Sequence, residues 1–297
     1  MAAYAGAPLT EVPISGASQP GRRGRRRRAW LYVVLIVGAA ITLYPLAWML
    51  FSSFKADSDI FSDPTSLPRT LDLKNYTAGW QSTTPSFTRY FINSFIICAG
   101  AVVGNVIACS LTAYAFGRLR FPLKRALFAI MLLTLMLPHH VLLIPQYVLY
   151  FNLGWVNTYL PLIVPKFLGT DAFFIFLMVQ FIRKIPRELD DSAAIDGCGP
   201  FSTYRYVVLP LLQPALVTTV IFTFIWTYND FFSQLIYLTS PNRVTVPVGV
   251  RELVDSSGGS YAQLLAMSVL SLVPTCAVFL IFQRRLVEGI STTGVKG

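Results

Sequence analysis

The side chains of this chain offer little scope for bond-making chemistry. Its 297 residues include only two histidines, His139 and His140, which are adjacent in sequence. Neighbouring histidines on a helix cannot face one metal ion, and no carboxylate or thiol lies near them, so we predict no metal site. No lysine follows a glycine, which excludes a G-K-[ST] phosphate-binding loop in this sequence. We therefore expect no catalytic residue, and the histidines are better suited to cap a helix or line a polar crevice.

Charged and small residues instead gather in the segment 185–210, IPRELDDSAAIDGCGPFSTYRYVVLP. Pro186 is placed to open a helix, and its missing N–H costs nothing there. Three acidic residues crowd the first turn, where the helix dipole favours negative charge: Glu188, Asp190 and Asp191. Small side chains follow at Ser192–Ala194, and Gly197 can take the left-handed conformation that ends a helix. We predict a helix-turn-helix whose small side chains let another protein approach the backbone closely.

A few polar residues interrupt long apolar runs, and ionisable groups inside a membrane are functional candidates. For Asp171, hydrogen bonding to a hydroxyl of a solute and an interfacial role stay equally open. For Asn229 and Asp230, capping at the membrane boundary is favoured over contact with solute. Trp226 and Tyr228 could stack on a ring of a solute, but anchoring at the membrane interface is the favoured interpretation.

The elements that must position these residues are membrane-spanning helices. Hydrophobic residues make up 54% of the chain and charged residues 13%, whereas soluble domains carry about a quarter charged residues. Backbone groups in lipid must be bonded within their own segment, so we predict an all-α fold. The predicted spans number about six: 29–51, 90–116, 126–138, 158–182, 207–229 and 261–283. An irregular or re-entrant stretch is expected after Pro138.

The distribution of basic residues predicts the orientation. Seventeen of the 24 lysines and arginines fall in the segments that are cytoplasmic if the N-terminus lies inside. This asymmetry places both termini in the cytoplasm. Residues 1–28 then form a basic cytoplasmic arm that we expect to be disordered, and 29–297 form one transmembrane domain. The net charge of +10 could suggest nucleic acid, but its placement between apolar runs favours a lipid bilayer and no nucleic-acid partner.

The cytoplasmic loop resembles the signature of ABC-importer permeases, E-A-A-x3-G-x9-I-x-L-P. Asp191, Ser192 and Ala193 stand at the E-A-A positions and Gly197 at the glycine. The I-x-L-P end falls on Val207, Leu209 and Pro210, with every interval kept. Asp for Glu, Ser for Ala and Val for Ile are the departures, and they put fine details of docking in doubt.

Further phrases are similar to the carbohydrate-uptake (maltose-type) group of these permeases, and to the second of its two permease subunits. They are AYAFGRLRFP (113–122), NTYLPLIVP (157–165), FTFIWTYNDFF (222–232) and the terminal VKG (295–297). The resemblance covers the chain from about Trp30 onward.

This resemblance implies a type I importer permease fold in a bacterial plasma membrane. The implied partners are a second homologous permease, a dimer of ATPases that binds ATP and Mg, and an extracytoplasmic sugar-binding protein. The chain itself would bind no cofactor and would be a transport subunit, not an enzyme. The implied contacts with the ATPase come from nine residues: Glu188, Asp191, Ser192, Ala193, Asp196, Gly197, Val207, Leu209 and Pro210.

Two alternatives stay open for the function. The same importer class could carry another polar cargo such as glycerol phosphate, which would need cationic residues in the pathway. The predicted spans hold none apart from Lys166 near the outer end of the fourth, which weakly favours an uncharged cargo. An autonomous secondary transporter should show inverted repeats with broken helices, and the sequence shows no such symmetry.

Overall fold

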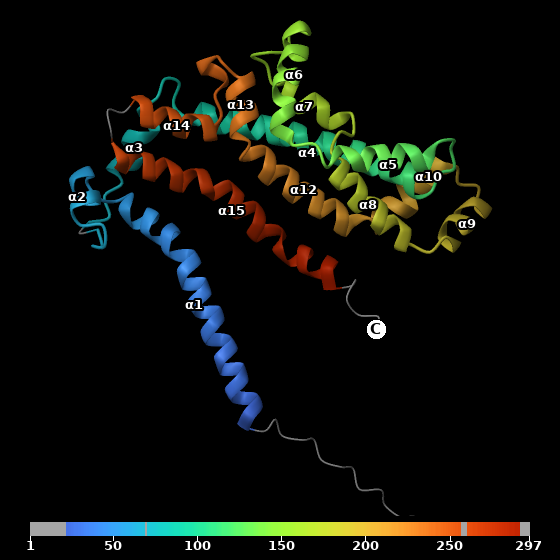
Figure 1. The fold of residues 1–297 in the computed structure, drawn as a ribbon, viewed down its shortest axis with the longest axis horizontal. Coiled ribbons are helices and arrows are strands. Elements are labelled where there is room, and N and C mark those ends of the chain that lie inside the picture. Colours follow the sequence, from blue (N-terminus) through green and yellow to red (C-terminus); the bar gives the residue numbers. More distant parts are fainter. Residues whose placement is uncertain (1–21, 69, 257–259, 292–297) are drawn as a thin grey trace, which may run out of the picture. The chain divides into compact units, whose positions relative to one another are not determined.

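The computed structural model describes residues 22–68, 70–256 and 260–291, and their regular elements are all helices (Figure 1). The chain divides into two compact units, residues 1–49 and 50–297. The first unit is dominated by α1 (Arg22–Ser52), which contains the apolar segment Trp30–Ser52 with a mean hydropathy of 2.2. Since α1 begins at Arg22, the end of the basic arm is helical, and residues 1–21 of that arm lie outside the described residues.

The second unit contains the remaining elements. In chain order they are α2 (Asp57–Ser62), α3 (Lys74–Gln81), α4 (Phe87–Gly117), α5 (Lys124–Thr134), α6 (His139–Asn152), α7 (Leu160–Phe167), α8 (Ala172–Lys184), α9 (Glu188–Ile195), α10 (Pro200–Thr203), the π-helix η1 (Tyr204–Val208), α11 (Leu209–Leu211), α12 (Gln213–Tyr228), α13 (Phe231–Tyr237), the 3-10 helix η2 (Pro241–Arg243), α14 (Val246–Ser256) and α15 (Tyr261–Ser291).

Within the described residues, four helical segments are long and apolar enough to cross a membrane. They are Trp30–Ser52, Phe87–Gly117, Leu160–Lys184 and Tyr261–Gln283. A fifth is obtained if Pro200–Leu211 and Gln213–Tyr228, which meet at 76°, count as one broken span. These five correspond to five of the six predicted runs, so the all-helical membrane fold is confirmed.

The third predicted run differs from the others. Residues 126–138 belong mostly to α5, which has 11 residues, whereas crossing the hydrocarbon core takes about 20. α5 ends before Pro138, which has extended backbone angles and leads into α6. The stretch after Pro138, which was expected to be irregular or re-entrant, is a 14-residue helix with Pro145 inside it, so it is not irregular.

The fifth predicted run begins later than expected. It was placed from Val207, but the apolar helix α12 starts at Gln213, because the chain bends by 76° between α11 and α12. Pro210 and Pro214 flank the bend, and proline lacks the N–H that an uninterrupted helix would use. The segment before the bend thus belongs to the cytoplasmic loop.

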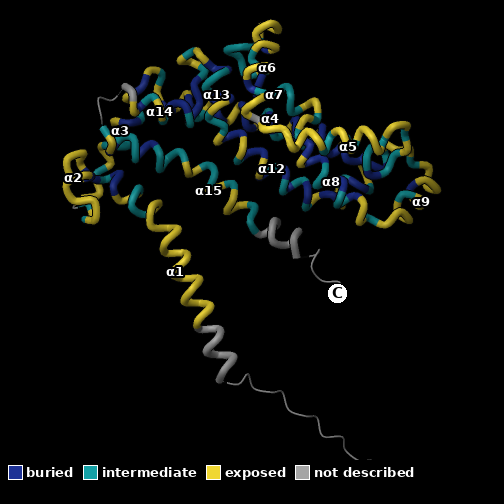
Figure 2. The backbone as a smooth tube through the Cα atoms, viewed as in Figure 1, coloured by how far each residue is buried: buried dark blue, intermediate teal, exposed yellow. Residues whose placement is uncertain are grey.

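α4 is the central helix of the second unit and packs against α7, α8 and α12. The close approach depends on glycines of α4. A Cβ atom at Gly117 would lie 2.6 Å from Cγ2 of Ile182, and one at Gly104 would lie 2.5 Å from the ring of Phe167. Figure 2 shows buried residues along α4, α8 and α12, while α5, α6 and α9 are largely exposed.

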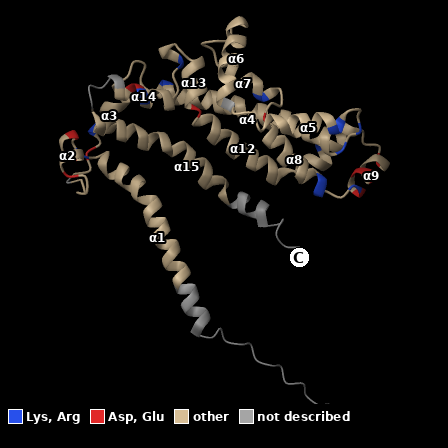
Figure 3. Ribbon diagram, viewed as in Figure 1, with Lys and Arg blue, Asp and Glu red and all other residues tan. Residues whose placement is uncertain are grey.

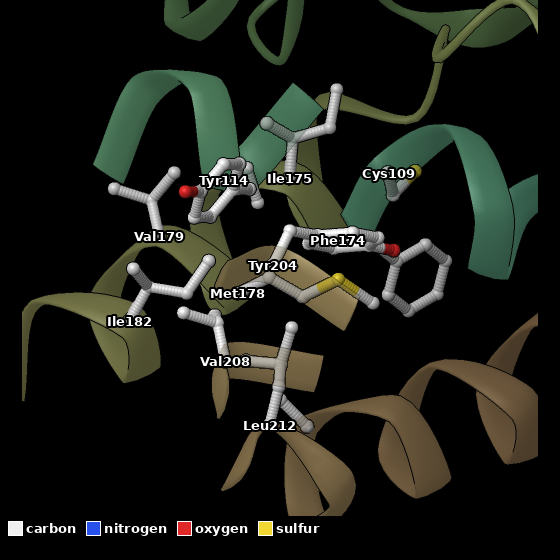
Figure 4. Packing of buried hydrophobic residues seen from close by; sticks show 12 residues of the cluster. Cys109, Tyr114, Phe174, Ile175, Met178, Val179, Ile182, Tyr204, Val208 and Leu212 are labelled. Carbon is white, nitrogen blue, oxygen red and sulfur yellow. The ribbon is translucent and has the colours of Figure 1, made fainter. Parts of the chain in front are cut away.

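One buried cluster joins these helices to the loop segment after α9. It combines Tyr114 from α4, Phe174 and Met178 from α8, and Val208 and Leu212 from the segments before α12 (Figure 4). Because apolar packing fixes the relative positions of all three segments, a displacement of the cytoplasmic loop must move α4, α8 or α12.

Candidate docking helix and intramembrane polar site

The docking helix α9 ends in the geometry that the sequence predicts. Gly197 has a φ of +83°, in the left-handed region. The N–H of Cys198 donates to the carbonyl of Ala193 at 2.8 Å, and that of Gly197 to the carbonyl of Ala194 at 3.1 Å. These two bonds form a Schellman motif, which satisfies carbonyls at the helix end. The expected left-handed glycine is confirmed.

The exposed surface of this helix combines acidic, small and apolar side chains. Ala193 is buried against the rest of the loop. The other five predicted docking residues of this part of the loop are exposed: Glu188, Asp191, Ser192, Asp196 and Gly197. Two apolar side chains are exposed beside them, Leu189 and Ile195, and Ile195 is 87% exposed. We call Glu188, Leu189, Asp191, Ser192, Ile195 and Asp196 the docking surface.

Basic and acidic residues also gather at this end of the second unit. Figure 3 shows them around α9 and the adjoining ends of α5 and α8. This concentration fits the cytoplasmic side in the predicted orientation.

The remaining predicted docking residues occupy a different position. Val207 and Leu209 are half-buried, and Leu209 packs against the cluster around Tyr114 and Phe174. Pro210 is exposed next to the bend before α12. These three residues precede the bend that connects the loop to α12.

α9 is held to α4 by an ion pair that sequence reasoning missed. Nε of Arg118 lies 2.9 Å from Oδ2 of Asp190, and the Arg118 side chain is only 6% exposed. Nη2 of Arg118 donates to the carbonyl of Ile185 at 2.7 Å. The sequence suggested only an orientation signal for Arg118 and a dipole contact for Asp190, because their pairing depends on the path of the intervening helices.

Two further polar side chains of α4 contact the second half of the loop. Tyr114 Oη donates to the carbonyl of Pro200 at 2.9 Å. The hydroxyls of Ser110 and Tyr204 share a hydrogen bond of 2.8 Å. Ser110, Tyr114 and Arg118 are spaced four residues apart and therefore form one stripe on the helix. This polar stripe at the end of an apolar helix is the signal that could have revealed the connection.

The structure also places the predicted pathway residues. Asp171 precedes α8 and accepts a hydrogen bond from Asn105 Nδ2 at 2.7 Å through Oδ2. The same oxygen lies 2.8 Å from Nζ of Lys166. Asn105 also donates to Oγ1 of Thr223 at 2.9 Å. Asp171 therefore belongs to a polar site built from α4, α7, α12 and the break between α7 and α8.

Asn229 and Asp230 have local roles at helix ends. Asp230 Oδ1 accepts from the N–H of Ser233 at 3.1 Å and so caps α13. Asn229 Nδ2 donates to the carbonyl of Ile225 at 2.8 Å. The two aromatic candidates differ: Tyr228 is buried and stacks on Phe224, whereas Trp226 is half exposed.

These features define a class: a helical membrane protein with several spans, in which the exposed helix α9 is fixed to the membrane helices. The chain belongs to the family described as binding-protein-dependent transport system inner membrane component, whose model matches residues 104–292.

Named relatives agree with this membership. The chain is 32% identical over 274 residues to the trehalose/maltose transport system permease protein MalG of Thermococcus litoralis, covering 91% of this chain and 98% of the relative. It is 32% identical over 266 residues to the sn-glycerol-3-phosphate transport system permease protein UgpE of Salmonella typhi, covering 87% and 94%.

A solved structure shows the same fold. A chain of a bacterial ABC transporter involved in the import of the acidic polysaccharide alginate superposes with a TM-score of 0.78 at 21% identity. The match covers 90% of this chain and 99% of that chain.

Proposed function

We propose that this chain is one permease subunit of an ATP-driven, binding-protein-dependent importer that carries a mono- or oligosaccharide. Membership of the family supports the transport role, and the maltose-type relative supports the carbohydrate cargo. The observation that carries the coupling role is the exposed helix α9, whose docking surface faces outward while Arg118 fixes its base.

The proposed mechanism assigns no bond-making step to this chain. ATP and Mg bind in a dimer of partner ATPases, and closure of that dimer moves the docked α9. The ion pair between Arg118 and Asp190 carries the movement to α4. The buried cluster around Val208 and Leu212 carries it to α8 and α12. A second permease and an extracytoplasmic sugar-binding protein complete the importer.

The docking role is tested by placing a charge at the tip of the docking surface. Because Ile195 is 87% exposed, Ile195→Glu removes an apolar contact from the partner without disturbing the core of this chain. We expect the ATPase to be lost from the complex purified through a tag on the Ile195→Glu chain. Quantitative mass spectrometry of the bound subunits gives the measurement.

The matched control is Leu67→Glu, which changes an exposed leucine between α2 and α3, in a loop that the predicted orientation places outside the cell. That variant should retain the ATPase at the wild-type ratio. If Ile195→Glu also retains it at that ratio, α9 does not dock the ATPase.

A further inference from the structure

Two opposite charges lie at the break between α7 and α8, within the apolar segment Leu160–Lys184. Lys166 is in the last turn of α7, and Asp171 directly precedes α8. Its Oδ2 atom lies 2.8 Å from Nζ of Lys166. The side chains are 26% and 28% exposed, so each charge is paired but not enclosed.

Next to this ion pair lie buried polar side chains whose hydrogen-bonding groups have partners. Asn105 and Thr223 are fully buried, and the amide nitrogen of Asn105 donates to both Asp171 and Thr223. Its amide oxygen accepts from the thiol of Cys109 at 3.2 Å. Every bond to the carboxylate of Asp171 reaches Oδ2, and among the described residues none reaches Oδ1. Oδ1 therefore keeps its capacity to accept a hydrogen bond from a solute.

An exposed aromatic ring lies beside these buried polar side chains. Trp226 follows Thr223 by one turn of α12 and is 49% exposed. Its ring lies 5.7 Å from the ring of Phe173 and 5.2 Å from that of Phe174, centroid to centroid. Both phenylalanines follow Asp171 within three residues. The ring is thus held near the ion pair.

Charged groups inside an apolar membrane segment rarely face lipid, because the hydrocarbon cannot solvate them. We therefore expect the partly exposed side of the pair to face water or protein. Since Lys166 and Asp171 neutralise each other, this face offers hydrogen-bond donors and acceptors without net charge. An anionic cargo would need an uncompensated cation here.

We propose that Lys166, Asp171 and Trp226 line the solute pathway and contact an uncharged, hydroxyl-rich solute. Asp171 Oδ1 accepts from a hydroxyl, the Lys166 ammonium donates to one, and the Trp226 ring packs against the apolar face of a sugar ring. This inference rests on the proposed function and assigns residues of this chain that contact its cargo.

The test measures water access and charge preference at Trp226 without requiring a known cargo. In the assembled importer in membrane vesicles, Cys98, Cys109, Cys198 and Cys276 are changed to alanine and Trp226→Cys is introduced. The probes are a cationic and an anionic methanethiosulfonate reagent of similar size, and we expect both to label the thiol at rates within about threefold. The amount of assembled chain, measured by immunoblot, controls for folding.

Variants of the ion pair supply the second readout. Lys166→Met should favour the cationic reagent by about tenfold or more, and Asp171→Asn the anionic reagent by as much, since one uncompensated charge remains within a few ångströms. The double variant should return the ratio to near one. It also keeps the test valid if a single variant fails to assemble.

Two results would overturn the inference. If only a lipid-soluble maleimide labels the thiol, this face lies in lipid. If the unaltered ion pair already favours the anionic reagent more than tenfold, the site is cationic and an uncharged cargo is excluded. Failure of the proposed function is a different result, namely an assembly that contains no ATPase.

Discussion

Gly197 is the residue on which the shape of the docking helix depends most directly. Its φ of +83° is costly for residues with a side chain, and a β-branched residue is the least tolerant. No heavy atom lies within 4 Å of the position of its Cβ, so strain in the backbone, not a clash, decides the outcome.

We therefore expect Gly197→Val to lower transport at least tenfold and to leave membrane insertion intact, because strain of about 1–3 kcal/mol distorts the end of α9. Uptake and ATP hydrolysis by the reconstituted importer give the measurement. Gly197→Asn should be much milder, since asparagine tolerates the left-handed region. Gly199→Ala is the control, because Gly199 has open space and an ordinary φ of −75°. Normal transport by Gly197→Val would contradict the docking role of α9.

Arg118 is the residue that fixes α9 to α4. Removing one partner of a buried ion pair leaves the other charge unpaired, and the cost for a fully buried pair is about 3–5 kcal/mol. Since Asp190 is 23% exposed, we expect Arg118→Met to cost less, about 1–3 kcal/mol, and to loosen the loop.

Limited proteolysis of the cytoplasmic loop in inside-out vesicles measures this effect. Cleavage near α9 should accelerate in Arg118→Met and return toward the wild-type rate in the double variant with Asp190→Asn, because no unpaired charge remains. Equal cleavage rates in the wild type and Arg118→Met would show that the ion pair does not hold the loop.

Among the helices, the contact between α4 and α8 is sensitive to a single added methyl group. A Cβ atom at Gly117 would stand 2.6 Å from Cγ2 of Ile182, which is fully buried. Gly117→Ala should therefore separate the helices and destabilise the complex by about 1–3 kcal/mol. Thermal aggregation of the detergent-solubilised complex should begin at a lower temperature. Ile182→Ala removes the clashing methyl group, so the double variant should be less affected than the sum of the two single variants predicts.

The helix α9 could be predicted from its own residues, but the ion pair that holds it to α4 could not. Pro186, the acidic first turn and Gly197 act within one short segment, so the sequence alone indicates a helix with a defined end. Arg118 and Asp190 are more than 70 residues apart, and only the packing of α4 against α8 brings them together. Asp171 could be singled out because a charge inside a membrane is energetically costly. Its contacts with Asn105 and Lys166 could not be predicted, since they depend on how the helices pack.

The lengths of the spans were harder to predict than their existence. An uncharged run indicates that a segment can enter lipid, but prolines decide where its helix breaks. Pro138 separates α5 from α6, and Pro210 and Pro214 accompany the bend before α12. Residues 207–229 carry no charge on either side of the bend, so they were predicted as one span where the structure has two helical segments.

At the scale of the whole molecule, orientation is the property that every other inference requires. Single cysteines at Leu67 and Ile195, in a background without native cysteines, test it with a membrane-impermeant thiol reagent on intact cells. The positive-inside rule predicts that Leu67→Cys reacts directly, and that Ile195→Cys reacts only after the membrane is permeabilised. The reverse pattern would place α9 outside and contradict any contact with a cytoplasmic ATPase.

The composition of the native assembly shows most directly whether this chain works as a permease subunit of an ATP-driven importer. The tagged chain is gently solubilised from its host membrane, and the proteins that accompany it are identified by mass spectrometry. We expect a soluble ATPase and a second, related permease to be recovered with the wild-type chain. With the Ile195→Glu chain, the ATPase should be lost and the second permease retained. Recovery of the chain alone, still able to transport a solute, would contradict its role as a subunit of such an importer.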